Sequence, residues 1–201
     1  GFQSFFSSIS IAPGSGPARR RGLERHPGVH VGPAIVGYPR LARMPTGGYR
    51  LSVGVATGAT TGPSQNCQVV ALTGSGTADA AFGSGGLASV PGGAGAGAVF
   101  CTALVVQSDG GTVLAGLSTA AQPFISRLQA GGAVDPGFDA SSVLEQFAAV
   151  SALGSGETGN LFVAGADRSG FYVPLVARAS GNGALDTAYG RAGTVIVEPE
   201  I

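Results

Sequence analysis

Three aspartates stand in the same short glycine-rich motif, and their spacing bears on the chemistry they could perform. Asp79, Asp135 and Asp186 lie 56 and 51 residues apart, and each is followed three residues later by an aromatic side chain. A carboxylate in a glycine-rich turn can accept hydrogen bonds from backbone N–H groups two or three residues further on. A catalytic aspartate would have no need to recur in every unit, so we interpret all three as turn locks. The aromatic partners, which we expect to bury against the next unit, are Phe82, Phe138 and Tyr189.

Two arginines occupy matching positions relative to these aspartates. Arg127 and Arg178 each precede the aspartate of their own unit by eight residues, where a guanidinium could form a charge-assisted pair with the carboxylate. In the first unit Ala71 stands at the aligned position, so no such arginine is expected there. We therefore predict a structural role for the aspartates, the aromatic residues and the two arginines.

Motifs for cofactors and metals are weak in this chain. Residues 154–159 read GSGETG and match the dinucleotide-binding pattern, but that site needs a helix to begin there. The next residues, NLFVAG, fit a strand, so we predict a hairpin turn and no cofactor. His26 and His30 flank a Pro-Gly pair that opposes a helix, and no carboxylate cluster completes a metal site. We predict no metal ion either.

Three acids outside the repeated motif are the remaining catalytic candidates. Asp109, Glu157 and Asp167 do not recur in register, and an active site can be assembled from different repeats of one fold. An enzyme of hydrolase or lyase type with an acidic site is therefore the alternative to a non-enzymatic protein. The chain has no GxSxG nucleophile motif, and we assign no catalytic residue.

The segments around each aspartate predict four short strands per unit. A first apolar strand leads to a glycine turn, and a second strand closes on Gly54, Gly116 or Gly165. Asp109-Gly110 is the signal for a type I′ hairpin turn, in which both central residues have positive φ. A third apolar strand follows, and a short fourth strand is expected after each aspartate, at residues 86–91, 142–147 and 194–200. The units span residues 41–91, 103–147 and 152–198, and they predict an all-β fold.

The middle unit carries the clearest version of the repeat. It contains VQ-x-DG at residues 106–110, an AG pair at residues 115–116, and an aliphatic strand ending in Arg127. Together with Leu185-Asp186 and Tyr189 of the third unit, these motifs resemble the delta-60 repeat of bacterial, often secreted or surface-associated proteins. That repeat is classed as β-propeller-like, and no general activity is attached to it.

The resemblance covers about residues 41–198 and implies a propeller-like fold of about three four-stranded blades. Residues 1–40 would then be an irregular segment or a degenerate blade. A closed propeller usually has at least four blades. Three blades therefore imply that the chain is a fragment, that residues 1–40 complete a blade, or that the chain packs on another protein.

Charge is distributed unevenly although the chain is neutral overall. All eleven basic residues are arginines; residues 1–100 carry a net charge of +5 and residues 101–201 a net charge of −5. Complementary halves of this kind could steer head-to-tail association. The arginine cluster at residues 19–25 has no interleaved aromatic residues, so nucleic-acid binding is not expected.

The two cysteines and one uncharged stretch bear on the compartment. Cys67 and Cys101 have neither CxxC nor zinc spacing, so they form either one disulfide or two buried thiols. Residues 87–106 are uncharged and long enough to span a membrane, but PGGAGAGA within them offers little bulky apolar surface. We expect no transmembrane helix.

Low charge, a repeated architecture and few catalytic groups favour a non-enzymatic repeat or scaffold module. We expect it to be extracellular, periplasmic or at the cell surface. Its partner would be a protein, a glycan or a second copy bound through exposed blade edges. It could serve as an accessory subunit of a larger assembly.

Overall fold

A computed structural model describes residues 34–57, 64–90, 98–118, 120–169 and 173–197 of the chain. These residues form three antiparallel sheets that follow one another along the sequence. The first sheet contains β1 (Ala34–Arg43), β2 (Tyr49–Thr57), β3 (Ser64–Leu72) and β4 (Leu87–Ser89). The second contains β5 (Ala98–Val106), β6 (Thr112–Ser118) and β7 (Pro123–Leu128). The third contains β8 (Phe147–Ser155), β9 (Leu161–Asp167), β10 (Pro174–Ala179) and β11 (Thr194–Ile196).

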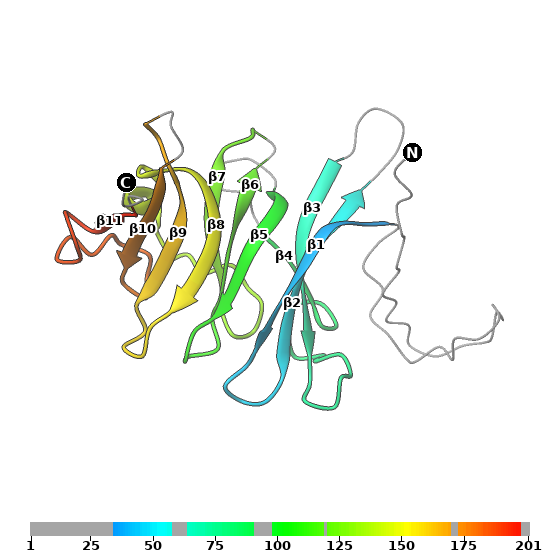
Figure 1. The fold of residues 1–201 in the computed structure, drawn as a ribbon. Helices are drawn as coiled ribbons and strands as arrows, with labels where there is room; N and C mark the ends of the chain where they lie inside the picture. Colours follow the sequence, from blue (N-terminus) through cyan, green and yellow to red (C-terminus); the bar gives the residue numbers. More distant parts are fainter. Residues whose placement is uncertain (1–33, 58–63, 91–97, 119, 170–172, 198–201) are drawn as a thin grey trace, which may run out of the picture.

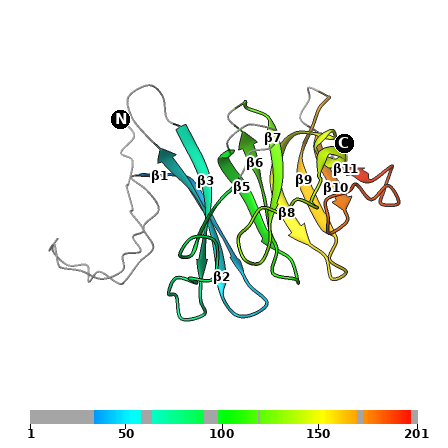
Figure 2. The ribbon, with the colours of Figure 1, turned by 180° about the vertical axis from the view of Figure 1, so that it is seen from behind.

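The prediction of an all-β fold is confirmed. In each sheet neighbouring strands are also consecutive in the chain, and the first strands β1, β5 and β8 lie next to one another. Figures 1 and 2 show the second sheet between the first and the third, from the front and from behind. Within the described residues the sheets do not close into a ring. The first strand begins at Ala34, inside the segment that we treated as separate from the repeats.

The middle unit departs from the prediction of four strands. The fourth strand expected at residues 142–147 is wrong: the chain forms the short helix α1 (Ser141–Leu144) there, and β8 begins at Phe147. The other two units turn into their fourth strands through glycines with positive φ, Gly83 and Gly86 in the first, Gly190 and Gly193 in the third. The middle unit has Asp139 and Ser142 at the aligned positions.

The physical reason for this helix is the lack of glycine at those positions. Side chains other than glycine rarely adopt positive φ, so Asp139 and Ser142 disfavour the turn that the other two units form. Instead, the Asp139 carboxylate accepts a hydrogen bond from the Ser141 N–H at 2.9 Å, which also lowers the pKa of Asp139. The single helical turn that follows buries Val143 in the core.

The hairpin turns share one geometry, and it is not the type I′ turn that we predicted. Asp109 does not have positive φ in this structure; only Gly110 does, at 82°. The Gln107 N–H donates to the Gly111 carbonyl at 2.8 Å, and the Gly110 N–H donates to the Gln107 carbonyl at 2.9 Å. A three-residue loop with glycine in the left-handed region has this form. The same pair of bonds recurs in six further turns. Five have a glycine at this position, Gly47, Gly76, Gly132, Gly159 and Gly183, and the sixth has Ala121, at φ 55°.

Two cores hold the three sheets together. One lies between the first and second sheets and includes Val69, Phe82, Leu114 and Phe124. The other lies between the second and third sheets, and its larger side chains are Val113, Ile125, Val143, Phe147, Leu161, Val163 and Leu175. The alternating residues of β6 therefore face a different core on each side, and nearly the whole strand is buried. Such a strand lies in the interior of a stack rather than at its surface.

The glycines that close the second strands are required by close packing. The register of β5 on β6 shifts between Cys101 and Ala103, and that of β8 on β9 shifts between Val150 and Ala152. These bulges bring a backbone carbonyl over each glycine. A Cβ added to Gly116 would lie 1.6 Å from the Phe100 oxygen, and one added to Gly165 would lie 2.0 Å from the Ala149 oxygen.

We expect Gly116→Ala and Gly165→Ala each to lower the free energy of unfolding by about 1–3 kcal/mol, because the bulged strand must move. Gly131→Ala is the matched control, since a Cβ there would meet nothing within 4 Å. Urea denaturation of the three variants measures the effect. A loss for Gly131→Ala as large as for the other two would contradict this explanation.

Candidate functional site

The three anchor aspartates occupy equivalent positions in their sheets. Each backbone N–H donates to a carbonyl of the third strand, and each Oδ1 accepts the N–H two residues further on. The first of these bonds is 2.9–3.0 Å long in all three units. The N–H of the aromatic residue three positions later returns to the carbonyl of the aspartate. The carboxylates therefore hold turns, as we interpreted them. The same backbone hydrogen bond fixes the position of the aromatic residue in each unit. The acceptors on the third strands are Ala71, Arg127 and Arg178.

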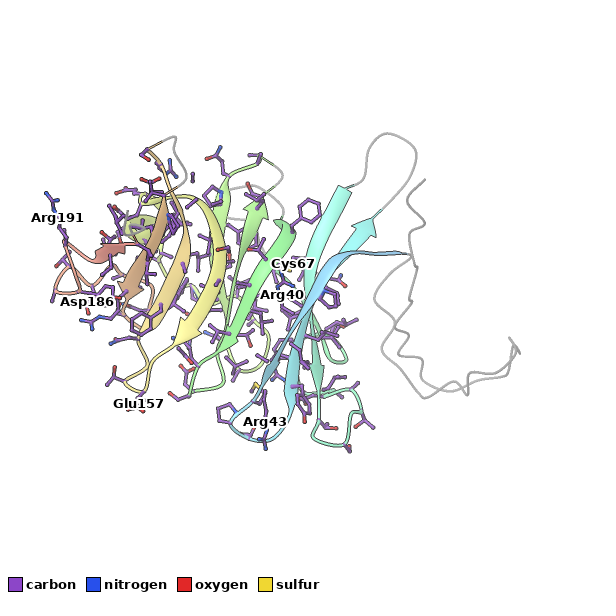
Figure 3. All side chains as sticks on the ribbon, in the orientation of Figure 1. Arg40, Arg43, Cys67, Glu157, Asp186 and Arg191 are labelled. Carbon is purple, nitrogen blue, oxygen red and sulfur yellow. A yellow bond between two sulfur atoms is a disulfide. The ribbon has the colours of Figure 1, made fainter. Side chains whose placement is uncertain are left out.

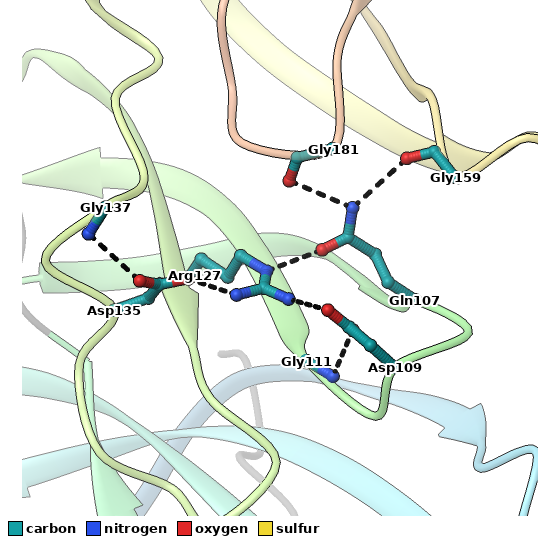
Figure 4. Close-up of polar contacts among 8 residues, drawn as sticks. All are labelled: Gln107, Asp109, Gly111, Arg127, Asp135, Gly137, Gly159 and Gly181. Atoms are coloured by element: carbon teal, nitrogen blue, oxygen red, sulfur yellow. Dashed lines mark hydrogen bonds and ion pairs between the residues drawn. The ribbon is translucent and has the colours of Figure 1, made fainter.

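Arg127 is the centre of a polar network in the second sheet. Its Nη1 pairs with Asp135 Oδ2, its Nη2 pairs with Asp109 Oδ2, and its Nε donates to Gln107 Oε1 at 2.6 Å (Figure 4). The Asp109 Oδ1 accepts the Gly111 N–H at 2.9 Å, which completes the hairpin turn. The guanidinium thus joins the end of the third strand to the turn between the first two strands.

Gln107 extends this network to the third sheet. Its Nε2 donates to the carbonyls of Gly159 and Gly181, at 3.4 and 3.2 Å (Figure 4). These two carbonyls belong to turns of the next unit. Because the Gln107 Oε1 is held by Arg127, the amide of Gln107 is oriented toward the third sheet, and we interpret it as a link between adjacent sheets.

The third unit has the same pairing of an arginine with the anchor aspartate, which we call an arginine lock, but aromatic rings surround it. Arg178 contacts Asp186 Oδ2 through Nε and through Nη2, both at 2.8 Å. The guanidinium carbon lies 4.9 Å from the centroid of the Tyr189 ring, and this ring meets Phe162 edge-on at 5.8 Å. A cation above an aromatic face adds an attraction to the ion pair.

The first unit also contains an arginine lock, which the sequence did not lead us to expect. Arg50 of β2 lies directly opposite Ala71 of β3, so both side chains share one face of the sheet. Its Nη1 is 3.7 Å from Asp79 Oδ2, and its guanidinium carbon is 4.3 Å from the centroid of Phe82. Burial lowers the pKa of Arg50, and Asp79 opposes that shift. The signal that could have revealed this lock is the strand register, because Arg50 replaces the missing arginine from across the ladder.

The exposure of the three arginines increases along the chain. The side chains of Arg50, Arg127 and Arg178 are 4%, 11% and 28% exposed. Arg50 also donates to the Ala130 carbonyl of the second sheet at 3.4 Å, so its lock lies inside a junction between sheets. The first two locks are covered by the following sheet, and the third lies on the free face of the third sheet.

Backbone hydrogen bonds cross both junctions at equivalent positions. The residue after the aromatic anchor donates its N–H to the next unit: Gly83 to the Gly131 carbonyl at 2.8 Å, and Asp139 to the Asn182 carbonyl at 2.9 Å. The first strands are linked as well, by Arg40 to the Thr102 carbonyl at 2.6 Å and by the Thr102 hydroxyl to the Val150 carbonyl at 2.8 Å. The two junctions therefore have the same architecture.

The two cysteines reinforce the first junction. Cys67 of β3 and Cys101 of β5 form a disulfide with a Cα–Cα distance of 5.9 Å. Of the two alternatives left open by the sequence, the structure has the disulfide. It links the first sheet covalently to the second.

Of the three acids considered for catalysis, Asp167 lies at the opposite end of the sheet from the neighbouring turns of Asp109 and Glu157. Asp109 lies in the turn between β5 and β6, and Glu157 at the tip of the turn between β8 and β9 (Figure 3). Asp167 ends β9, at the opposite end of a seven-residue strand, which places it about 20 Å from that turn. Its Oδ1 accepts the Ser169 hydroxyl at 2.9 Å and the Val173 N–H at 3.1 Å. Two of these three carboxylates therefore hold turns.

The structure also bears on the motifs considered for a cofactor, a metal ion and a membrane span. The GSGETG motif at residues 154–159 forms the end of β8 and the turn before β9, so a strand follows it. Among the described residues no three His, Cys, Asp or Glu side chains are grouped so as to hold a metal ion. No helix in this part of the chain has the length and apolar character needed to cross a membrane. His26, His30, the arginine cluster and residues 91–97 of PGGAGAGA lie outside the described residues.

Comparison with known proteins does not identify the chain. No family model matches it, and no curated protein matches it significantly. The resemblance to the delta-60 repeat therefore rests on the motifs in the sequence.

We expect that the arginine paired with Asp79 can be supplied by Ala71→Arg on β3 in place of Arg50 on β2. Arg50→Val should lower the free energy of unfolding by about 3 kcal/mol, because it leaves Asp79 without its partner. Adding Ala71→Arg to that variant recreates the Val113 and Arg127 pair of the second sheet and should restore more than half of the loss. Denaturation of the single and double variants tests this, and a double variant no more stable than Arg50→Val would contradict it.

Asp109 should contribute to stability in a pH-dependent way. The Gly111 N–H, and then Arg127, hold the pKa of Asp109 below the usual range of an aspartate. A carboxylate with a depressed pKa stabilises the fold fully above the unfolded pKa of about 4, and this contribution is lost as the pH falls below that value. Asp109→Asn should therefore reduce the loss of stability between about pH 4 and pH 2. Glu157→Gln, which removes an exposed carboxylate from the aligned turn, measures the effect of net charge; equal slopes for Asp109→Asn and the wild type would contradict the assignment.

Proposed function

We propose that this protein is a non-enzymatic repeat module that binds another macromolecule, as an accessory subunit of an extracytoplasmic assembly. We further propose that its sheets are blades of a β-propeller of the delta-60 type. Adjacent first strands, consecutive strand order and repeated locks support the propeller arrangement. The disulfide between Cys67 and Cys101 supports an extracytoplasmic location, because such bonds persist in oxidising compartments.

The edge of the third sheet carries the proposal of binding. Strand β11 is the last strand of that sheet, and Val195, Ile196 and Val197 are 39%, 51% and 52% exposed. Three consecutive exposed aliphatic residues at a sheet edge are unusual, because an unpaired edge recruits other strands. Such an edge fits an extended polypeptide better than a glycan, since the backbone groups of a polypeptide can continue the ladder.

The carboxylates are engaged in structural roles, which supports the non-enzymatic interpretation. Asp79, Asp135 and Asp186 pair with arginines, and Asp109 pairs with Arg127. Replacing any of them would first change the fold. Glu157 lies on an exposed turn between β8 and β9.

Site-specific photo-crosslinking in the cells that produce the protein tests this proposal. A crosslinking residue at Val197 should form a covalent adduct with a polypeptide, and the same residue at Glu157, also exposed, is the control. An adduct from Glu157 but not from Val197 would contradict binding at this edge. Turnover of any substrate that is lost in the combined variant Asp109→Asn, Glu157→Gln, Asp167→Asn, but not in a variant of equal stability, would overturn the non-enzymatic function.

A further inference from the structure

Three buried polar atoms lie in the first junction, between the first and second sheets, without a hydrogen-bond partner. They are Nε of Arg50, Oγ of Ser52 and Oγ1 of Thr112, and among the described residues no other buried side-chain nitrogen or oxygen lacks one. Their residues are 3%, 1% and 0% exposed, so bulk water does not solvate them. Buried polar groups in proteins are nearly always bonded to another residue, to an ordered water or to an ion, because an unpaired one opposes folding.

The three side chains enter this junction from its two sides. Arg50 and Ser52 stand two residues apart on β2 and therefore share one face of the first sheet. That face is turned toward the second sheet, because Nη2 of Arg50 donates to the Ala130 carbonyl in the turn after β7 at 3.4 Å. Thr112 stands two residues before Leu114 on β6, and Leu114 belongs to the core between the first and second sheets.

The repeat indicates that these three positions meet. Val113 and Ala115 of β6 occupy in the second sheet the places that Arg50 and Ser52 occupy in the first. Leu161 opens β9 as Thr112 opens β6. All three aligned residues of the second junction belong to one core, so the corresponding residues of the first junction are brought together in the same way. That second set is entirely aliphatic: Val113, Ala115 and Leu161.

Contacts around the guanidinium agree with this placement. Gly110 stands two residues before Thr112, and a Cβ added to it would lie 3.2 Å from the Ala130 Cβ and 3.5 Å from Met44 Cε. The carbonyl of the same Ala130 is the one that Arg50 binds. The start of β6 therefore lies beside the group that holds Arg50.

The chemistry of the three groups favours an anion. Nε of Arg50 can only donate a hydrogen bond, and the hydroxyls of Ser52 and Thr112 can donate as well. The charge of Arg50 is only partly compensated, because its Nη1 is 3.7 Å from Asp79 Oδ2, beyond hydrogen-bond distance, and that carboxylate is one-third exposed. Burial lowers the pKa of Arg50 by more than Asp79 raises it. A negative charge in the junction would offset this imbalance.

We propose that the first junction binds a single small anion, a halide such as chloride, between Nε of Arg50 and the hydroxyls of Ser52 and Thr112. A halide ion accepts all three hydrogen bonds at once. Phosphate or sulfate would bring further oxygens, for which the described residues offer no other unpartnered buried side-chain donor. The aliphatic side chains at the aligned positions make the second junction unsuited to an ion. This site goes beyond the proposed binding of a macromolecule and does not depend on it.

Thermal unfolding of the full chain in two sodium salts tests the proposal. The protein is purified without chloride and unfolded in sodium chloride or in sodium gluconate at the same ionic strength. Gluconate is too large for a buried site with three donors, so it controls for screening by salt. A ligand that binds only the folded state stabilises it, and we expect an unfolding midpoint about 2–4 °C higher in chloride. Equal midpoints in the two salts would overturn the proposal.

Removal of the hydroxyls separates binding at this site from a general effect of chloride. Ser52→Ala and Thr112→Val should each lose most of the difference between the salts. In gluconate they should be at least as stable as the wild type, because each removes a buried hydroxyl without a partner, and in chloride they should be less stable. Ser151→Ala, which removes an exposed hydroxyl from the third sheet, is the control and should keep the full difference. Retention of that difference by both hydroxyl variants would contradict this site.

Crystals grown in sodium bromide locate the ion directly. Bromide substitutes for chloride and has a distinct anomalous signal, so we expect one peak within hydrogen-bond distance of Arg50 Nε and of the hydroxyls of Ser52 and Thr112. A water molecule at that position, or bromide bound only at the molecular surface, would overturn the anion site. Crosslinking at Val197 would still report separately on binding to another polypeptide.

Discussion

Each sheet in this protein has two apolar faces, and an apolar face is stable only when another surface covers it. The second sheet shows the full effect, because alternate residues of β6 enter different cores and nearly all of the strand is buried. Small buried side chains such as Ala103, Ala115 and Ala177 let the second and third sheets approach closely. The glycines beneath the bulges have the same purpose within a sheet. Close packing therefore accounts for glycines such as Gly116 and Gly165, whereas those of the hairpin turns provide positive φ.

The arginine locks set the geometry in which this stacking can occur. Each one fixes the turn that carries an aromatic anchor, and Arg50 and Gln107 also bond directly to the following sheet. The position of the guanidinium matters more than the strand that supplies it. Arg50 reaches Asp79 from the second strand, whereas Arg127 and Arg178 reach their aspartates from the third. Degenerate repeats can therefore keep a common fold while their sequence motifs diverge.

The repeat made much of this fold predictable, since the anchor aspartates, the aromatic residues and most strands follow from self-similarity alone. The features that escaped prediction depend on contacts between strands. Arg50 could be recognised only from its place opposite Ala71, which requires the register. Helix α1 and the turn at Asp109 depend on which residues adopt positive φ, and a motif that tolerates Asp, Asn or Gly does not determine this.

The disulfide makes the two junctions mechanically different. In a linear array of units, stability is the sum of unit and neighbour terms, so opening can start at the weakest junction. The first junction is held covalently by Cys67 and Cys101, whereas the second depends on packing and on hydrogen bonds such as those of Gln107. Local opening should therefore begin by detachment of the third sheet, with the first two still joined. A protease in the surrounding medium would meet a durable two-sheet body, and its first accessible cleavage sites would lie in the segment around α1 that connects this body to the third sheet.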